Sequence, residues 1–234
     1  MATASGILFL WHVLSTAALW TSLAWCLQLG MGPVLPFMFT GWTLVANLAH
    51  FSIAAALALA PGSPRLAAVR RLHAGSFGVC FAMSCVTCGA FWGLTLSLGD
   101  VVIPAHVREL LPSALNHFLH SLPLALVLLE PLLVPPHALR AWRSERIAMW
   151  CVGGAYLLLL LWVRHAFSHA VYPFLRYFDG WAFALFALLV AAAIRSIQAA
   201  LGAWRRAAAQ FWSIVGGGGG GADPGKVSAG TRHL

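Results

Sequence analysis

Residues 147–163 read IAMWCVGGAYLLLLLWV, an apolar stretch without a single charged residue. A helix needs about 20 predominantly apolar residues to cross the roughly 30 Å hydrocarbon core of a bilayer. Six stretches of the chain meet this requirement, at 6–28, 36–60, 75–98, 112–134, 148–168 and 180–202. The sequence therefore predicts an all-α, polytopic integral membrane protein, a bundle of six transmembrane helices.

The composition excludes the other common protein classes. Apolar residues make up 61% of the 234 residues and charged residues only 9%, whereas a soluble domain has about 25% charged residues. The net charge of +8 comes from 14 cations spread along the whole chain, which is too sparse for a nucleic-acid surface. We therefore expect membrane lipids as partners, and no nucleic acid. The oligomeric state has no signature in the sequence.

The five cysteines all stand in apolar stretches, so no disulfide framework of the secreted kind is expected. Cys85 and Cys88 form a CxxC pair in the third stretch. This pair is interpreted as two small residues on a helix face, because the loop cysteines that would relay electrons are absent.

Basic residues alternate between the loops. They are concentrated in the second loop, in the fourth loop and after the sixth stretch, at Arg65, Arg70, Arg71, Arg140, Arg143, Arg146, Arg205, Arg206, Lys226 and Arg232. Because cytosolic loops carry the excess of Lys and Arg, both termini are predicted to be cytosolic. Residues 1–204 are predicted to form the transmembrane domain and 205–234, with six consecutive glycines at 216–221, a flexible cytosolic tail. The membrane is expected to be the endoplasmic reticulum, another endomembrane or the cell membrane.

Polar side chains in three predicted helices lie toward the same, non-cytosolic side of the membrane. They are Thr40, Thr43 and Asn47 in 36–60, Asn116, His117 and His120 in 112–134, and Arg164 and His165 at the end of 148–168. Polar residues inside a membrane are energetically expensive, so each is a candidate for function. Hydrophobicity alone gives no reason for these polar residues to share one depth in the membrane. Their convergence therefore predicts a functional site.

Threonine is a weak nucleophile until a base within hydrogen-bonding reach accepts its proton, and a neutral histidine is such a base. Thr40 with His120 is therefore a candidate pair. The structural alternatives stay open at this point: Thr40 can bond the backbone of its own helix, and a buried histidine can be a satisfied core residue.

The histidines also raise the question of a metal. His117 and His120 form an HxxH pair and His165 and His169 an HxxxH pair, but no membrane carboxylate stands beside them. A metal-dependent or haem-dependent membrane oxidoreductase is therefore the less favoured interpretation, and the sequence predicts no metal and no cofactor. Glu130 is expected to pair with Arg195, which lies at similar depth in the sixth stretch.

Three segments resemble a known family. They read LNHFLHS at 115–121 and onward to Glu130, AYLLLLLWVRH at 155–165 followed by VYPFL at 171–175, and FTGWTLVAN at 39–47. They are similar to the androgen-induced protein and androgen-dependent TFPI-regulating protein family. Members of that family are membrane threonine hydrolases that cleave fatty acid esters of hydroxy fatty acids.

The resemblance implies a threonine-dependent carboxylic ester hydrolase with Thr40 as nucleophile and His120 as base. Leu44 and Asn47 then stand where the family has a leucine and an amide, whereas Gly41 and Thr43 depart from its pattern. Thr43 remains a rival nucleophile. The alternative function is that of a non-enzymatic multi-pass regulator or lipid-binding protein.

The resemblance also suggests roles for the neighbouring polar residues. Asn47, Asn116 or His117 would orient the base or bind the oxyanion. Arg164 or His165 would hold the substrate carboxylate near the membrane surface.

Overall fold

A computed structural model describes residues 2–60, 63–99, 109, 111–139, 143–167, 171–172, 175 and 180–217. The long helices are α1 (Ala2–Gln28), α2 (Phe39–Leu59), α3 (Ala67–Leu98), α7 (Arg143–Phe167) and α8 (Gly180–Gly217). Two shorter helices, α5 (Ser113–His120) and α6 (Leu122–Leu133), lie between α3 and α7. Short 3-10 turns stand at η1 (Leu35–Phe37), η2 (Pro64–Leu66) and η4 (Pro136–Leu139). These ranges contain no β-strand, and the all-α prediction is confirmed.

The long helices match the predicted membrane spans. Five are long and apolar enough to cross a membrane, and α5 with α6 adds a sixth when the bent pair is counted as one span. The chain is therefore a multi-pass membrane protein. The boundaries differ most at the end of α8, which continues to Gly217 rather than to residue 202, and at the start of α3, which begins at Ala67 rather than at residue 75.

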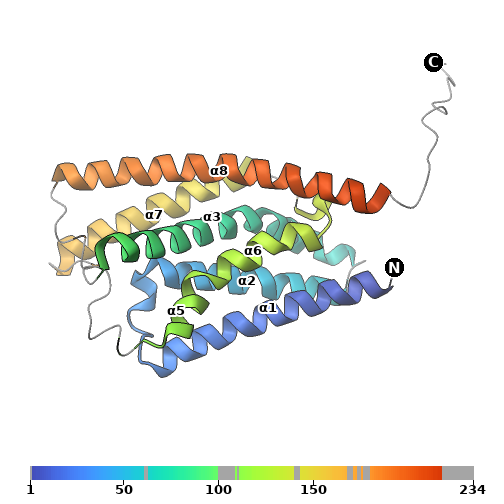
Figure 1. The fold of residues 1–234 in the computed structure, drawn as a ribbon, viewed down its shortest axis with the longest axis horizontal. Coiled ribbons are helices and arrows are strands. Elements are labelled where there is room, and N and C mark those ends of the chain that lie inside the picture. The colour runs from blue at the N-terminus through green and yellow to red at the C-terminus, as the bar shows by residue number, and fades with distance from the viewer. Residues whose placement is uncertain are drawn as a thin grey trace, which may run out of the picture.

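The helices pack around α3, which contacts α2, α5, α6, α7 and α8. Figure 1 shows α7 and α8 side by side on one flank of α3, with α1 and α2 on the other. The start of α1 and the end of α8 lie at the same end of the bundle. This placement is what an even number of membrane crossings requires.

The outer surface is apolar, unlike that of a soluble protein, and the apolar interior contains several buried polar groups. Large apolar side chains point outward, among them Leu96, Leu158 and Leu188, each more than 60% exposed. Asn47 and Glu130, in contrast, are fully buried. The apolar exterior fits a lipid environment, and the interior polar groups must find their partners within the bundle.

The α5–α6 pair is bent by 44° at Ser121. Pro123 stands at the start of α6, where it has no N–H to donate to the preceding turn. The Trp92 indole on α3 donates a 2.9 Å hydrogen bond to the Ser121 hydroxyl and so supports the bend. As a result, His120 is the last residue of a short helix that points into the bundle.

The last helix is longer than the sequence indicated. The prediction that the flexible tail begins at residue 205 is wrong for 205–217, because α8 continues to Gly217. Arg205 makes two 2.9 Å hydrogen bonds to the buried Glu145 carboxylate on α7, and the Trp212 indole donates to the Pro131 carbonyl at 3.0 Å. These contacts fix the end of α8 to the bundle. Residues 218–234 lie outside the described residues.

The expected pairing of Glu130 with Arg195 is also wrong. The Arg195 guanidinium lies over the Trp150 ring, 5.8 Å from its centroid. Glu130 instead contacts the imidazole of His50, with Oε2 at 2.8 Å from Nε2. Equal depth along two helices did not place them face to face, since α6 turns this carboxylate toward α2.

Candidate active site

The beginning of α2 sets the position of Thr40. Pro36 is the second residue of the η1 turn, and Met38 is extended (φ −94°, ψ 134°) where the chain enters α2. Gly41 then packs against the Leu35 carbonyl, an approach that leaves no room for a β carbon. Thr40 is thereby fixed as the second residue of α2, and its side chain is buried.

Two tyrosines hold the same helix end. The Phe39 N–H donates to the hydroxyls of Tyr156 (2.9 Å) and Tyr172 (3.0 Å). The Tyr156 hydroxyl also donates to the Phe37 carbonyl at 3.0 Å. Burial raises the pKa of Tyr172 above its usual range, so its hydroxyl stays protonated at neutral pH. These contacts satisfy one of the amide groups that a helix start leaves unpaired.

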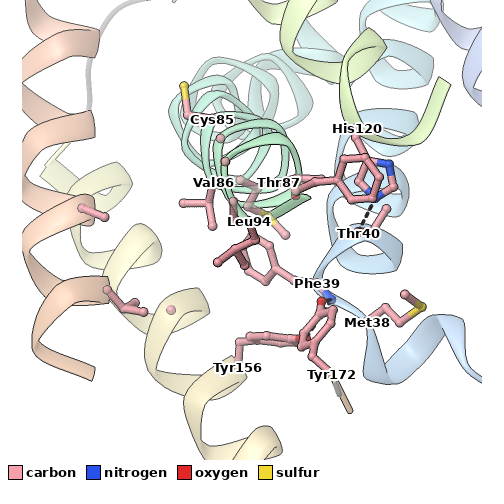
Figure 2. Close-up of a pocket in the computed structure, with 18 of the residues that line it drawn as sticks. Met38, Phe39, Thr40, Cys85, Val86, Thr87, Leu94, His120, Tyr156 and Tyr172 are labelled. Atoms are coloured by element: carbon pink, nitrogen blue, oxygen red, sulfur yellow. Dashed lines mark hydrogen bonds between the residues drawn. The ribbon is translucent and has the colours of Figure 1, made fainter. Parts of the chain in front are cut away.

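Thr40 and His120 face each other. Thr40 Oγ1 lies 3.3 Å from His120 Nε2, and Figure 2 shows the two side chains pointing toward one another from α2 and α5. His120 Nδ1 lies 2.9 Å from the Asn116 carbonyl oxygen. A carbonyl oxygen only accepts hydrogen bonds, so Nδ1 carries the proton and Nε2 is the acceptor. The Thr40 hydroxyl therefore donates to His120, as a nucleophile does to its base.

The orientation of the His120 imidazole ring is also fixed. The Phe91 ring on α3 stacks on it with a centroid distance of 3.5 Å and an interplanar angle of 9°. The Asn116 carbonyl and the Phe91 ring together leave the imidazole little freedom to rotate. The base is consequently oriented before any substrate binds.

Thr40 and His120 line a cavity of about 1010 Å³. This volume lies at the upper end of the roughly 300–1,000 Å³ typical of small-molecule sites. Most of the wall is apolar and comes from α3, α7 and α8, with residues such as Leu94, Leu160 and Ile194. Polar residues also line it, among them Asn116, Tyr156 and Tyr172, together with Thr87, which Figure 2 shows close to His120. A long apolar molecule with one reactive polar group fits such a cavity.

The sequence model of one protein family, described as FAR-17a/AIG1-like protein, matches residues 12–203. The chain belongs to the FAR-17a/AIG1-like family. This is the family that the segments at 39–47, 115–130 and 155–175 resemble, so that prediction is confirmed. No curated protein and no solved structure matches the chain.

In this FAR-17a/AIG1-like protein, the rival Thr43 lies outside the cavity wall. Its hydroxyl is fully buried and donates to the Phe39 carbonyl at 3.0 Å. It also lies 2.6 Å from the Thr87 hydroxyl on α3. Thr43 thus links α2 to α3, and both partners of its hydroxyl are groups other than His120.

Asn47 takes part in the same contact between α2 and α3. Its side-chain amide donates to the Thr43 carbonyl at 2.9 Å and to the Ser84 hydroxyl at 3.1 Å. It does not line the cavity. The structure therefore separates Asn47 from the Thr40–His120 pair, with which the sequence had grouped it.

Of the remaining predicted site residues, some line the cavity and others do not. Asn116 lines the cavity and orients His120 through its backbone carbonyl. His117 is exposed and lies against the Trp92 ring, 5.0 Å between centroids. Arg164 and His165, near the end of α7, are not part of the cavity wall. His169 lies outside the described residues.

Three aromatic residues were missing from the predicted site. Tyr156 and Tyr172 stand inside the segments that resemble the family, so their place in those motifs was an available signal. Phe91 carries no such signal, because its contact with His120 joins two helices and has no local spacing pattern.

Proposed function

We propose that this FAR-17a/AIG1-like protein is a membrane-embedded lipid esterase that hydrolyses fatty acid esters of hydroxy fatty acids. Thr40 is the nucleophile and His120 the general base. The observation that carries the proposal is the 3.3 Å contact between Thr40 Oγ1 and the proton-free Nε2 of His120, at the wall of an apolar cavity.

The first half of the reaction forms an acyl-enzyme. Thr40 Oγ1 attacks the ester carbonyl carbon while its proton passes to His120 Nε2, and the carbonyl electron pair moves onto oxygen. When the tetrahedral intermediate collapses, the carbon–oxygen bond to the leaving hydroxy fatty acid breaks. The leaving alkoxide takes the proton from His120 Nε2 and departs as the free hydroxy acid.

The second half releases the fatty acid. A water molecule attacks the acyl carbonyl carbon and gives one proton to His120 Nε2. The new tetrahedral intermediate collapses, the bond to Thr40 Oγ1 breaks, and His120 returns the proton to that oxygen. The net reaction consumes one water and produces a fatty acid and a hydroxy fatty acid.

The start of α2 supplies a donor for the negative oxygen of both intermediates. The Thr40 N–H has no hydrogen-bond acceptor among the described residues, and it lies at the positive end of the α2 dipole. In serine proteases, the backbone N–H of the nucleophile itself contributes to the oxyanion hole. We assign the same role to the Thr40 N–H, and the tyrosine contacts to Phe39 keep this helix end in place.

The shape and composition of the cavity support a substrate of this class. The apolar walls from α3, α7 and α8 accommodate hydrocarbon chains, and the reactive pair meets the ester bond. A substrate dissolved in the bilayer would enter laterally between helices. Burial of the reacting groups also strengthens the electrostatic contacts that stabilise the intermediate.

Three alanine variants test the proposal in membranes or detergent. Thr40→Ala removes the nucleophile and should abolish both hydrolysis and labelling by a fluorophosphonate probe. His120→Ala should reduce both by a factor of about 100 to 10,000, the usual contribution of a general base. Thr43→Ala is the matched control, since it removes a threonine hydroxyl three residues away and should retain labelling.

The outcomes separate the alternatives. If Thr40→Ala is labelled normally and Thr43→Ala is not, the nucleophile is Thr43. If all three variants, accumulating to wild-type levels, hydrolyse lipid esters as an active wild type does, the assignment of Thr40 and His120 fails. If the purified wild type neither hydrolyses lipid esters nor is labelled, a non-enzymatic membrane regulator or lipid-binding protein is the better interpretation.

A further inference from the structure

A second group of polar side chains lies buried between helices and has no part in the esterase mechanism. It consists of His12 on α1, His50 on α2, His73 on α3 and Glu130 on α6. Each is at most 7% exposed, and Glu130 is fully buried. Four ionisable groups from four helices thus meet inside a membrane protein, where such groups are rare and functional by default. We refer to them as the histidine–glutamate cluster.

The ligand atoms of the cluster converge. Atoms of His50, His73 and Glu130 that can bind a metal lie within 4.8 Å of one another. Glu130 Oε1 is 3.6 Å from both His12 Nε2 and His73 Nε2, and Oε2 is 2.8 Å from His50 Nε2. Around a zinc ion with bonds of about 2.0–2.1 Å, tetrahedral ligand atoms lie roughly 3.3 Å apart. The three distances from Glu130 to the histidines lie on either side of that value, and His12 is outside the group of three whose atoms all lie within 4.8 Å of one another.

The proton positions indicate that His50 presents a lone pair to the cluster. The Ser76 hydroxyl donates its proton to the His73 carbonyl at 2.8 Å, so its oxygen accepts the 2.8 Å hydrogen bond from His50 Nδ1. With Nδ1 as the donor, the Nε2 of a neutral His50 is an acceptor, and it faces a carboxylate oxygen that is also an acceptor. A cation shared by the two atoms resolves this conflict.

Several atoms of the cluster have no hydrogen-bond partner within 3.5 Å, and their nearest contacts in the cluster are the 3.6 Å approaches given above. These atoms are both ring nitrogens of His12, Nε2 of His73 and Oε1 of Glu130, all buried within the described part of the chain. Leaving a buried polar group unpaired costs about 1–3 kcal/mol, and more when it is charged. One bound ion would satisfy the Glu130, His73 and His12 atoms together.

We propose that the histidine–glutamate cluster is a structural zinc site. Imidazole and carboxylate ligands suit zinc. His50, His73 and Glu130 form the convergent set. His12, whose Nε2 lies 3.6 Å from Glu130 Oε1, would be the fourth ligand of a closed structural site. The 2+ charge of the ion compensates the Glu130 carboxylate, which has no Arg or Lys partner among the described residues. The bond from His50 Nδ1 to Ser76 is the kind of outer contact that orients a metal-binding histidine.

The proposed site departs from the expectation that the chain carries no metal. That expectation considered His117, His120, His165 and His169, whose short spacings resemble ligand motifs. The four residues of the cluster are spread from position 12 to position 130, and only folding brings them together. No local sequence motif therefore indicates such a site.

Elemental analysis of the purified full-length protein is the direct test. Wild type purified in detergent should contain about one zinc per chain. His73→Ala should lose it by about tenfold or more, whereas His73→Cys, which keeps a ligand at the position, should retain it. Ser76→Ala should retain the ion but bind it about 10–100-fold more weakly.

His120→Ala is the matched control, because it removes a buried histidine outside the cluster. It should keep its zinc even though the proposed esterase activity is lost, so the two proposals fail independently. A second readout covers the case in which His73→Ala does not fold: chelator-treated wild type loaded with Co²⁺ should show the visible absorption of tetrahedral cobalt, and added Zn²⁺ should abolish it.

Two results would overturn the proposal. One is wild type that contains far less than one metal ion per chain and shows no tetrahedral cobalt spectrum. In that case the cluster is held by a proton shared between His50 and Glu130. The other is equal zinc in wild type and in the folded His73→Ala variant, which would make the ion adventitious.

Discussion

The α carbon of Gly41 packs against the carbonyl oxygen of Leu35, and a β carbon at position 41 would overlap that oxygen. The contact lets α2 begin at Phe39, one residue before Thr40, with only Met38 between it and the η1 turn. Glycine at this position therefore has a steric reason, although it departs from the pattern of the family that the segment resembles.

Gly41→Ala should move the start of α2 and with it Thr40. We expect a destabilisation of about 1–3 kcal/mol, as for other substitutions that overfill a packed site, and loss of most of the esterase activity. Gly75→Ala is the control, since a β carbon there meets nothing within 4 Å. Thermal unfolding in detergent together with ester hydrolysis measures both effects, and a fully active Gly41→Ala protein would contradict the prediction.

The pair of Thr43 with Thr87 should behave as a structural contact. Thr43→Val leaves the Thr87 hydroxyl without this partner and should cost about 1–3 kcal/mol. The double variant Thr43→Val/Thr87→Val should recover part of that loss. A double-mutant cycle with thermal unfolding measures the coupling. Additive effects of the two substitutions would show that the 2.6 Å contact contributes nothing to stability.

Phe91 should act on the reaction through His120. Phe91→Leu keeps an apolar residue but removes the stacked ring, an interaction of about 0.5–1.5 kcal/mol. We expect kcat to fall by about 2–12-fold with little change in KM, because the base loses orientation while the rest of the cavity remains. Steady-state kinetics with a lipid ester separates the two constants. A change confined to KM would mean that Phe91 only contacts the substrate.

The ion pair of Glu145 with Arg205 should decide whether 205–217 belong to the folded domain. Glu145→Gln leaves the Arg205 guanidinium without its carboxylate, and breaking a buried pair costs about 3–5 kcal/mol. A chain that ends at residue 204 should be destabilised similarly, whereas a chain that ends at Gly217 keeps the pair. Melting temperatures of the three proteins provide the comparison. Equal stability of both truncated chains would mean that α8 is dispensable beyond residue 204.

The orientation of the bundle is predicted from its arginines. Tags at both termini should be accessible from the cytosol, because the basic residues cluster on that side. An N-glycosylation acceptor inserted within 101–110 should be modified when the protein enters the secretory pathway. Protease protection in sealed vesicles is an independent measurement. A lumenal N-terminal tag would reverse the orientation and place the esterase site in the cytosolic half of the membrane.

The membrane spans could be read from the sequence because hydrocarbon thickness sets the length of an apolar run. The end of α8 could not, since Arg205 looks like the end of such a run unless its partner Glu145 is known. The partner of Glu130 was wrong for a related reason. Depth along a helix follows from counting residues, but the direction in which a side chain points depends on helix rotation and packing.

In the candidate site too, the sequence could predict some of the contacts and not others. Thr40 and His120 could be paired in advance because both stand in segments that resemble a family, and their side chains lie 3.3 Å apart. Asn47 was grouped with them because it shares a helix face with Thr40. That face is wide enough for Thr40 to meet α5 while Asn47 meets α3. The histidine–glutamate cluster involves four helices and has no sequence pattern.

The break at Ser121 has a consequence for how the protein is made. The eight residues of α5 are too few to cross a bilayer, so the ribosome must also deliver α6 before this part of the chain can settle in the membrane. By that time α2 with Thr40 has been synthesised, but His120, which activates Thr40 in the proposed mechanism, is not yet in place. On the proposed mechanism, a nascent or prematurely terminated chain cannot attack the lipids that surround it during biogenesis.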